Sequence, residues 1–241
     1  MLQTLYKTPF SRAYWRDALA DARKPRTLVF SALMVAACVA LSYLRSIPVV
    51  NNIRVSWGFL ARALCALVGG PVNALVFGFV EDTVSYLMNP TGGYNPFYIF
   101  TTMLGVLTYS LFLYRAQVTV LRVFLAKLAT NIQNVFIGGL GTYLWYSGGK
   151  GYGAIVAASA VKNAIMLPIQ TVMLAALFAA LLPILHRMGF LPDQAGRLRL
   201  WSWAHAANAG GGTAGRPARP QEPRREPWEQ PQKPRREPWE E

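Results

Sequence analysis

Acidic residues are scarce in this sequence, and that scarcity limits what the protein can be. Between Asp21 and Asp193 the chain holds only two acidic side chains, the adjacent pair Glu81 and Asp82. Only 15% of the 241 residues are charged and 53% are hydrophobic, whereas about 25% are charged in typical soluble domains. A soluble helical protein would need charged helix faces, and a disordered one would be poor in apolar residues. The composition therefore favours a protein that lies mostly in lipid.

Cysteine and catalytic motifs are also sparse. The two cysteines, Cys38 and Cys65, are too few for a disulfide framework or a four-ligand zinc site. The sequence has no phosphate-binding P-loop, no H-E-x-x-H motif and no G-x-S-x-G motif. We therefore expect no catalytic residues, no metal and no cofactor, and we favour a binding or transport role over an enzyme.

Apolar segments long enough to cross a bilayer dominate the first 190 residues. A spanning helix needs about 20 apolar residues, and the second segment is short by that measure. The last segment is too long for a single crossing, so we expect either a kink at Pro168 or a start at the interface. The pattern predicts an all-α integral membrane protein with a six-helix bundle, over residues 28–44, 57–68, 71–88, 97–114, 123–146 and 152–185.

The distribution of positive charge predicts an orientation. A net charge of +13 would suggest nucleic acid for a soluble protein, but loop charges explain it here and we expect no nucleic acid partner. Cytoplasmic loops of membrane proteins are enriched in Lys and Arg, and six spans place both termini on one side. That side holds the N-terminal arm together with Arg62, Arg115, Arg122, Arg187, Arg197 and Arg199, against Arg45, Arg54 and Lys150 opposite. We expect both termini in the cytoplasm.

The chain divides into four parts by composition. A basic arm covers residues 1–27, the membrane domain covers 28–190, and a segment with Arg199, Trp201 and Trp203 at 191–205 is typical of an interfacial anchor. Residues 206–241 repeat Pro-Arg-Arg-Glu-Pro-Trp-Glu at 223–229 and 234–240. Such proline density and alternating charge predict a disordered tail.

The acidic pair is the first candidate for ligand binding. Helical spacing places Gly78, Asp82 and Ser85 on one small and polar stripe, with Glu81 about 100° away. An ionised carboxylate is costly in hydrocarbon and should face the bundle interior, water or a cation. The alternative is that Asp82 lies near the aqueous end and pairs with Arg54.

Two later segments carry further polar side chains. Lys127, Asn131 and Asn134 share one face of the fifth segment, and Lys162 and Asn163 lie in the sixth. Paired amides offer donors and acceptors together, which suits the edge of a heterocycle, although interhelical hydrogen bonding explains any one of them equally well. Lys162 and Arg54 are candidate partners for an anionic group.

A loop and an alanine repeat complete the candidate residues. The loop at 89–97 contains Tyr94, Asn95 and Phe97 between prolines and glycines, and it can either cap a pocket with a ring or form an ordinary hairpin turn. Alanine recurs at strict spacings of four in the first span, and small residues in register let another helix approach closely. These alanines are Ala32, Ala36 and Ala40.

Taken in order, these residues resemble the substrate-binding S components of energy-coupling factor (ECF) vitamin transporters, most closely the folate-type family. The resemblance covers about residues 28–190. It is carried by an ordered set of motifs along the chain: Arg54-Val55-Ser56-Trp57, Gly69-Gly70-Pro71, Gly78 and Asp82, Pro90, Gly93 to Phe97, Thr101, Asn131 and Asn134, and Lys162-Asn163 before Leu167-Pro168-Ile169.

The resemblance implies a function and a set of partners. It implies a vitamin pocket near the outer face, a coupling protein that contacts the alanine face, and two separate ATPase subunits that supply the hydrolysis. The ligand expected from it is folate or a related pterin, read by Asp82 and the amides, with Tyr94 or Phe97 stacked on the ring and Arg54 or Lys162 on the carboxylates. The alternatives are another vitamin or a nucleobase-derived precursor, or a structural membrane protein without a transport role.

Overall fold

A computed structural model describes most of the first 202 residues. The described residues are Tyr6, Pro9 and the ranges 11–43, 47–50, 53–55, 57–88, 95–149, 151–192 and 198–199. All of them belong to one compact unit, residues 1–202. The expected tail at 206–241 and its tryptophans lie outside the described residues.

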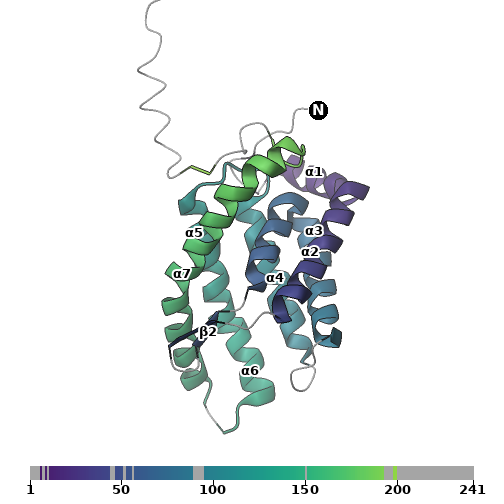
Figure 1. The fold of residues 1–241 in the computed structure, drawn as a ribbon. Helices are drawn as coiled ribbons and strands as arrows, with labels where there is room; N and C mark the ends of the chain where they lie inside the picture. Colours follow the sequence, from purple (N-terminus) through teal and green to yellow (C-terminus); the bar gives the residue numbers. More distant parts are fainter. Residues whose placement is uncertain are drawn as a thin grey trace, which may run out of the picture. The chain divides into compact units, whose positions relative to one another are not determined.

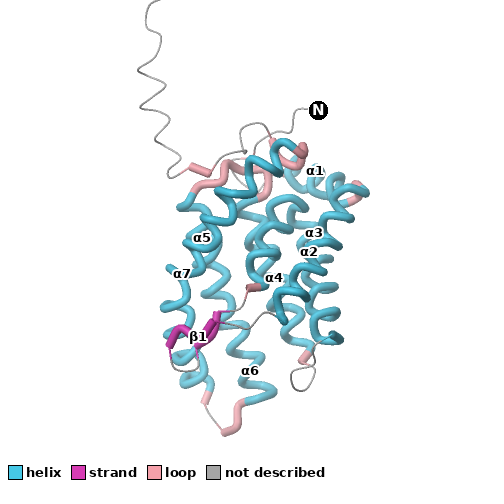
Figure 2. The backbone as a smooth tube through the Cα atoms, in the orientation of Figure 1, coloured by secondary structure: helices cyan, strands magenta, loops and turns pink. Residues whose placement is uncertain are grey.

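Helices make up nearly all of the described structure (Figure 1). A two-stranded antiparallel hairpin, β1 and β2, is the exception to the all-α expectation (Figure 2). Five helical stretches are long and apolar enough to cross a membrane: α2, α3, α4, the continuous run α5–η1–α6, and α7. The elements are α1 (Arg12–Ala22), α2 (Pro25–Tyr43), β1 (Ile47–Val50), β2 (Ile53–Val55), α3 (Gly58–Met88), α4 (Pro96–Leu113), α5 (Val120–Gln133), the π-helical turn η1 (Asn134–Gly138), α6 (Gly139–Tyr146) and α7 (Tyr152–Arg187).

The 31-residue helix α3 is folded back on itself at Gly70. The backbone there leaves the helical region, with φ 73° and ψ −179°, a conformation essentially restricted to glycine. Arg62 and Glu81 lie 19 residues apart in this helix, yet their side chains are bonded at 3.0 Å. In a straight helix a rise of 1.5 Å per residue would separate them by about 28 Å. The two halves of α3, residues 58–69 and 71–88, therefore form a helical hairpin, which agrees with the two separate segments predicted from the sequence.

The α3 hairpin is the most buried part of the bundle. In its most apolar stretch 72% of residues are buried, against 22% to 33% in the other candidate spans. It packs most extensively against α4 and α2. Gly78 allows the approach to α4, since a Cβ at this position would lie 2.7 Å from the Cα of Met103. The outer helices instead expose large apolar side chains such as Val29, Phe100 and Val172, as expected for surfaces in contact with lipid.

Helix α1 docks against the end of the bundle where α4 joins α5. Tyr14, Ala18 and Asp21 form its buried face. Arg115 donates to Asp17 Oδ2 at 2.6 Å and to Asp21 Oδ2 at 2.8 Å. The N-terminal arm is thus a structured helix in residues 12–22, held by ion pairs.

The Asp21 carboxylate is the centre of this contact. Burial alone would raise the pKa of Asp21, but hydrogen bonds from Lys24, Tyr114 and Arg115, with the charge of Arg115, lower it below its ordinary value. The carboxylate is therefore ionised at neutral pH. It completes the ion pairs that hold α1.

Gly70→Ala tests the α3 hairpin. A Cβ at Gly70 would lie 2.9 Å from the Tyr114 ring, and backbone strain at this φ and ψ adds about 1–3 kcal/mol for a residue with a side chain. We expect a lower thermal unfolding midpoint in detergent micelles. Gly153→Ala is the control, because open space surrounds its Cβ position and alanine favours a helix. Equal midpoints for the two variants would contradict a glycine-dependent turn.

Candidate ligand-binding site

A cavity of about 670 Å³ lies between α3, α4, α5 and α7. Its volume is within the range of about 300–1,000 Å³ typical of small-molecule pockets. Polar side chains reach its wall from every one of these helices. Among them are Arg62, Asp82 and Ser85 from α3, Tyr98, Thr101, Thr102 and Tyr109 from α4, Lys127, Thr130, Asn131 and Gln133 from α5, Asn134 from η1, and Lys162, Asn163 and Gln170 from α7.

Glu81 and Arg62 form the ion pair that joins the two halves of α3. The guanidinium donates from both Nε and Nη2 to the two carboxylate oxygens at 3.0 Å, and the hydroxyl of Ser85 donates to Oε1 at 3.3 Å. Glu81 is 2% exposed, so water cannot stabilise its charge. The guanidinium of Arg62 does so inside the bundle. Arg62 lies inside α3 and is paired there, so, contrary to the prediction from the charge distribution, it is not one of the positive charges of the cytoplasmic loops.

Asp82 has a different partner from its neighbour. It accepts a hydrogen bond from the hydroxyl of Thr102 on α4 at 2.8 Å and lies on the cavity wall. A hydroxyl does not neutralise a carboxylate. No cation bonds to the Asp82 carboxylate among the described residues, and its oxygens can accept hydrogen bonds from N–H donors.

The α5 face contributes a cation and two amides. Lys127 is 7% exposed, its Nζ lies 5.0 Å from the centre of the Phe59 ring, and among the described residues it has no carboxylate partner. Asn131 donates from Nδ2 to the backbone oxygen of Asn163 at 3.2 Å. One amide thus also ties α5 to α7, so the interhelical and ligand-binding interpretations of this face both apply.

A π-helical turn follows these residues. It begins at Asn134, and such turns are frequent at functional sites because the extra residue shifts the side chains that follow. Beyond the turn, Gly141 contacts the Phe97 ring, since a Cβ there would lie 2.7 Å from Cδ1. This glycine therefore permits the approach of another helix, α4, and not of a ligand.

Six of the nine predicted ligand residues line this one cavity: Asp82, Asn95, Asn131, Asn134, Lys162 and Asn163. Phe97 is not among the lining residues and packs on Gly141 and on Trp145, with ring centres 6.2 Å apart. Tyr94 and the side chain of Arg54, which lies in β2, are outside what the structure describes. Ligand contact by each of these residues stays a prediction.

Asn95 has a structural task besides its place on the wall. Its Oδ1 caps α4 by accepting from the backbone N–H of Phe97 at 2.9 Å, and its Nδ2 donates to the oxygen of Gly141 at 3.4 Å. Both ends of the amide are therefore already bonded within the protein. Asn95 therefore fixes the start of α4 against Gly141 at the cavity wall.

The sequence prediction missed several residues of the site. Arg62, Tyr109 and Gln170 line the cavity but were not among the nine, and Lys127 was noted on its stripe without being assigned to the site. For Arg62 and Lys127 a usable signal exists, because each is a cation within an apolar segment and such residues mark functional sites in membranes.

The bundle and its cavity define a class of protein: a helical membrane protein that can hold a small polar ligand between its spans. No family model matches the chain. It is 27% identical over 153 residues to the folate transporter FolT of Clostridium novyi (strain NT), which covers 63% of this chain and 87% of the relative. A crystal structure of FolT bound with folic acid matches with a TM-score of 0.54 at 25% identity, over 62% of this chain and 89% of that one.

Both comparisons confirm the resemblance to the folate-type S components of ECF transporters. Together with the apolar helices they identify a multi-pass membrane protein related to transporters and not to enzymes. The comparisons leave the role of individual cavity residues to experiment.

Arg62→Met and the double variant Arg62→Met/Glu81→Met test the ion pair. Removing one partner leaves an unmatched charge in the bundle and should cost about 3–5 kcal/mol, whereas removing both can be nearly neutral. We expect the single variant to lower the thermal midpoint strongly and the double variant to recover most of the loss. A double variant as unstable as the single one, or less stable, would contradict this account.

Proposed function

We propose that this chain is the membrane-embedded, folate-binding subunit of an ECF-type uptake transporter. The observation that carries the proposal is the shared cavity of about 670 Å³, in which an unneutralised carboxylate, amides and lysines converge. The similarity to FolT, over most of that protein's length, supports folate or a close pterin relative over another vitamin.

The chemistry of folate matches the distribution of charge in the cavity. A pterin ring presents adjacent N–H donors, which a carboxylate such as Asp82 can accept in pairs. The same ring carries a carbonyl oxygen, for which the ammonium group of the buried Lys127 is a suitable donor. The glutamate end carries two carboxylates and would meet the exposed Lys162 on α7. In this arrangement the ring is buried and the flexible end lies near the opening.

We further infer six membrane passes with both termini in the cytoplasm. The α3 hairpin supplies two of the passes, its first half being a short, deeply buried one, and α2, α4, α5–η1–α6 and α7 supply the other four. With six passes the N-terminal helix α1 and the end of α7 share one side, where Arg115, Arg122 and Arg187 also lie. The surplus of cations on this side supports a cytoplasmic location.

Transport energy would come from separate subunits: a transmembrane coupling protein and two ATPases. The alanine face of α2 supports such a contact, since Ala32, Ala36 and Ala40 are all exposed. Small exposed residues at spacings of four allow close approach of a partner helix within the membrane.

Asp82→Asn tests the proposed ligand. The substitution keeps the size and the acceptor for Thr102 but removes the charge that would bind the pterin edge. We expect calorimetric titration with folate to show more than a tenfold loss of affinity, equivalent to at least about 1.4 kcal/mol. Thr83→Val is the control, because Thr83 bonds within its own helix and does not line the cavity. No heat of binding for the native chain with folate would overturn the assignment.

The two lysines can be distinguished with a truncated ligand. Pteroic acid lacks the glutamate, so Lys162→Met should weaken the binding of folate and leave that of pteroic acid unchanged. Lys127→Met should weaken both, because the proposed contact is to the ring. The measurement is the ratio of the two dissociation constants for each variant. A Lys162→Met variant that loses both ligands equally would place the glutamate elsewhere.

A further inference from the structure

Helix α1 has a second face that the bundle does not use. Its buried residues, Tyr14, Ala18 and Asp21, point to the helical bundle. On the opposite side, Arg12, Arg16 and Arg23 are exposed. At 100° per residue these three arginines fall within one narrow stripe. The two faces of the helix therefore carry opposite charges: the acidic side chains face the bundle and the arginines face away from it.

An apolar flank accompanies the basic stripe. Trp15 and Leu19, one helical turn apart, are 42% and 43% exposed. They lie between the buried face and the arginines. A tryptophan and a leucine beside a row of arginines is the composition of helices that lie in the membrane interface.

The arginines on this stripe have no counter-ion among the residues that the structure describes. Both acids of α1 are bonded to Arg115, which comes from the α4–α5 connection, and Asp21 also pairs with Lys24. In the described part of the chain, none of the three stripe arginines forms an ion pair. The outward face of α1 therefore carries three unmatched positive charges.

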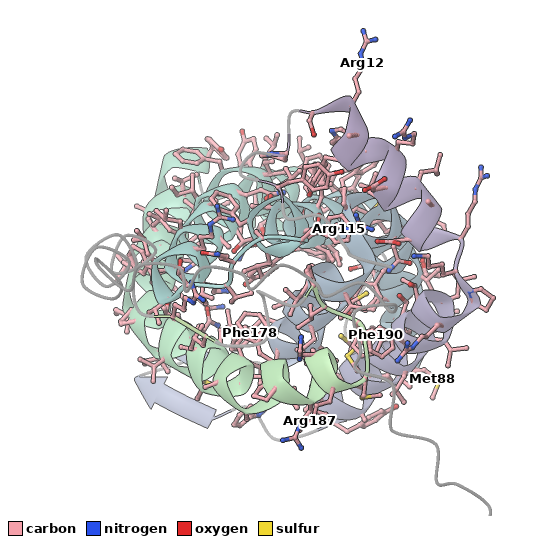
Figure 3. All side chains as sticks on the ribbon, turned by 90° about the horizontal axis from the view of Figure 1, so that it is seen from above. Arg12, Met88, Arg115, Phe178, Arg187 and Phe190 are labelled. Carbon is pink, nitrogen blue, oxygen red and sulfur yellow. The ribbon has the colours of Figure 1, made fainter. Side chains whose placement is uncertain are left out.

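The position of α1 along the chain fixes its depth. Helix α2, the first candidate span, starts at Pro25, and only two residues separate it from the end of α1 at Ala22. Helix α1 cannot lie far from the level where α2 enters the membrane. Seen along the bundle, α1 runs along the edge, with Arg12 pointing away from the other helices (Figure 3). It therefore lies across the end of the bundle and near the plane of the lipid headgroups.

We propose that the outer face of α1 binds the anionic headgroups of the adjacent membrane leaflet, with Arg12, Arg16 and Arg23 on the phosphates and Trp15 and Leu19 at the acyl boundary. Charge complementarity selects the occupant, because anionic lipid is the abundant negative surface at this depth. The ion pairs to Arg115 hold the helix in place, so its arginines are presented without a folding cost on binding. This role is independent of the ligand cavity.

The test uses the full-length chain in detergent micelles, titrated with phosphatidylglycerol or with phosphatidylcholine. The readout is the rise in thermal midpoint at each lipid concentration. An arginine near an anionic surface gives roughly a fivefold gain in affinity. We therefore expect the variant Arg12→Gln/Arg16→Gln/Arg23→Gln to lose at least about tenfold in apparent affinity for phosphatidylglycerol, with little change for phosphatidylcholine. Its midpoint without added lipid should equal that of the native chain, since none of the three side chains is buried.

Two matched controls distinguish an effect of the position of these arginines from an effect of net charge. Arg12→Lys/Arg16→Lys/Arg23→Lys keeps the charge and should retain most of the preference for phosphatidylglycerol. Arg219→Gln/Arg224→Gln/Arg225→Gln removes the same net charge from the C-terminal tail and should leave the preference unchanged. An undiminished preference in the α1 glutamine variant would overturn the proposal, and so would an equal loss in the tail variant.

A spin label at Leu19→Cys adds a second readout for the chain reconstituted in phosphatidylglycerol nanodiscs. We expect the label to be shielded from a water-soluble relaxation agent and accessible to oxygen. The label could instead be accessible to the aqueous agent in the isolated protein and become shielded only after partner subunits are added. That result would show that this face binds a protein, and it would overturn the lipid assignment.

Discussion

The cost of placing ions in a lipid-bathed bundle is the constraint on which the rest of this structure depends. Charged side chains at membrane depth must pair with one another or face a polar cavity, and Arg62 and Glu81 pair with each other through two hydrogen bonds. That pair forms only if α3 reverses direction between them. Gly70 provides the reversal, because its backbone conformation is closed to residues with a side chain. The hairpin, and with it one wall of the cavity, follows from matching a single buried charge.

The adjacent acids Glu81 and Asp82 divide two tasks that one residue could not perform. Successive residues of a helix point about 100° apart. Glu81 therefore faces the first half of α3, while Asp82 faces α4 and the cavity. Because Arg62 already pairs with Glu81, neither residue is needed to bond Asp82, whose carboxylate lies on the cavity wall where the proposed ligand would bind. A single carboxylate at this depth could either pair with Arg62 or contact the proposed ligand, but it could not do both.

Much of this arrangement could be predicted from the sequence. The apolar segments located the helices to within a few residues, because hydrophobic length is a strong signal, and polar residues inside those segments pointed to the cavity. The partner of Glu81 could not be predicted. Arg62 lies 19 residues away in the sequence, and the two side chains meet because of the hairpin and not because of helical periodicity. The π-helical turn at Asn134 could not be predicted either, because no residue pattern in this segment distinguishes it from a regular α-helix. Docking of α1 depended on Asp21 meeting Arg115, 94 residues away, which no local pattern encodes.

The large positive charge of the chain also finds a structural explanation. In the described part of the chain, every acidic side chain has an internal partner: Asp17 and Asp21 bond to Arg115, Glu81 to Arg62, and Asp82 to Thr102. Only Lys24, Arg62 and Arg115 form ion pairs in that part of the chain, so its other lysines and arginines have no bonded carboxylate there. The proposed ligand would meet those in the cavity, and the proposed contact with lipid headgroups would use those at the end of the bundle. The same scarcity of acid that indicates a membrane protein thus leaves most of the cations in the described residues without a carboxylate partner.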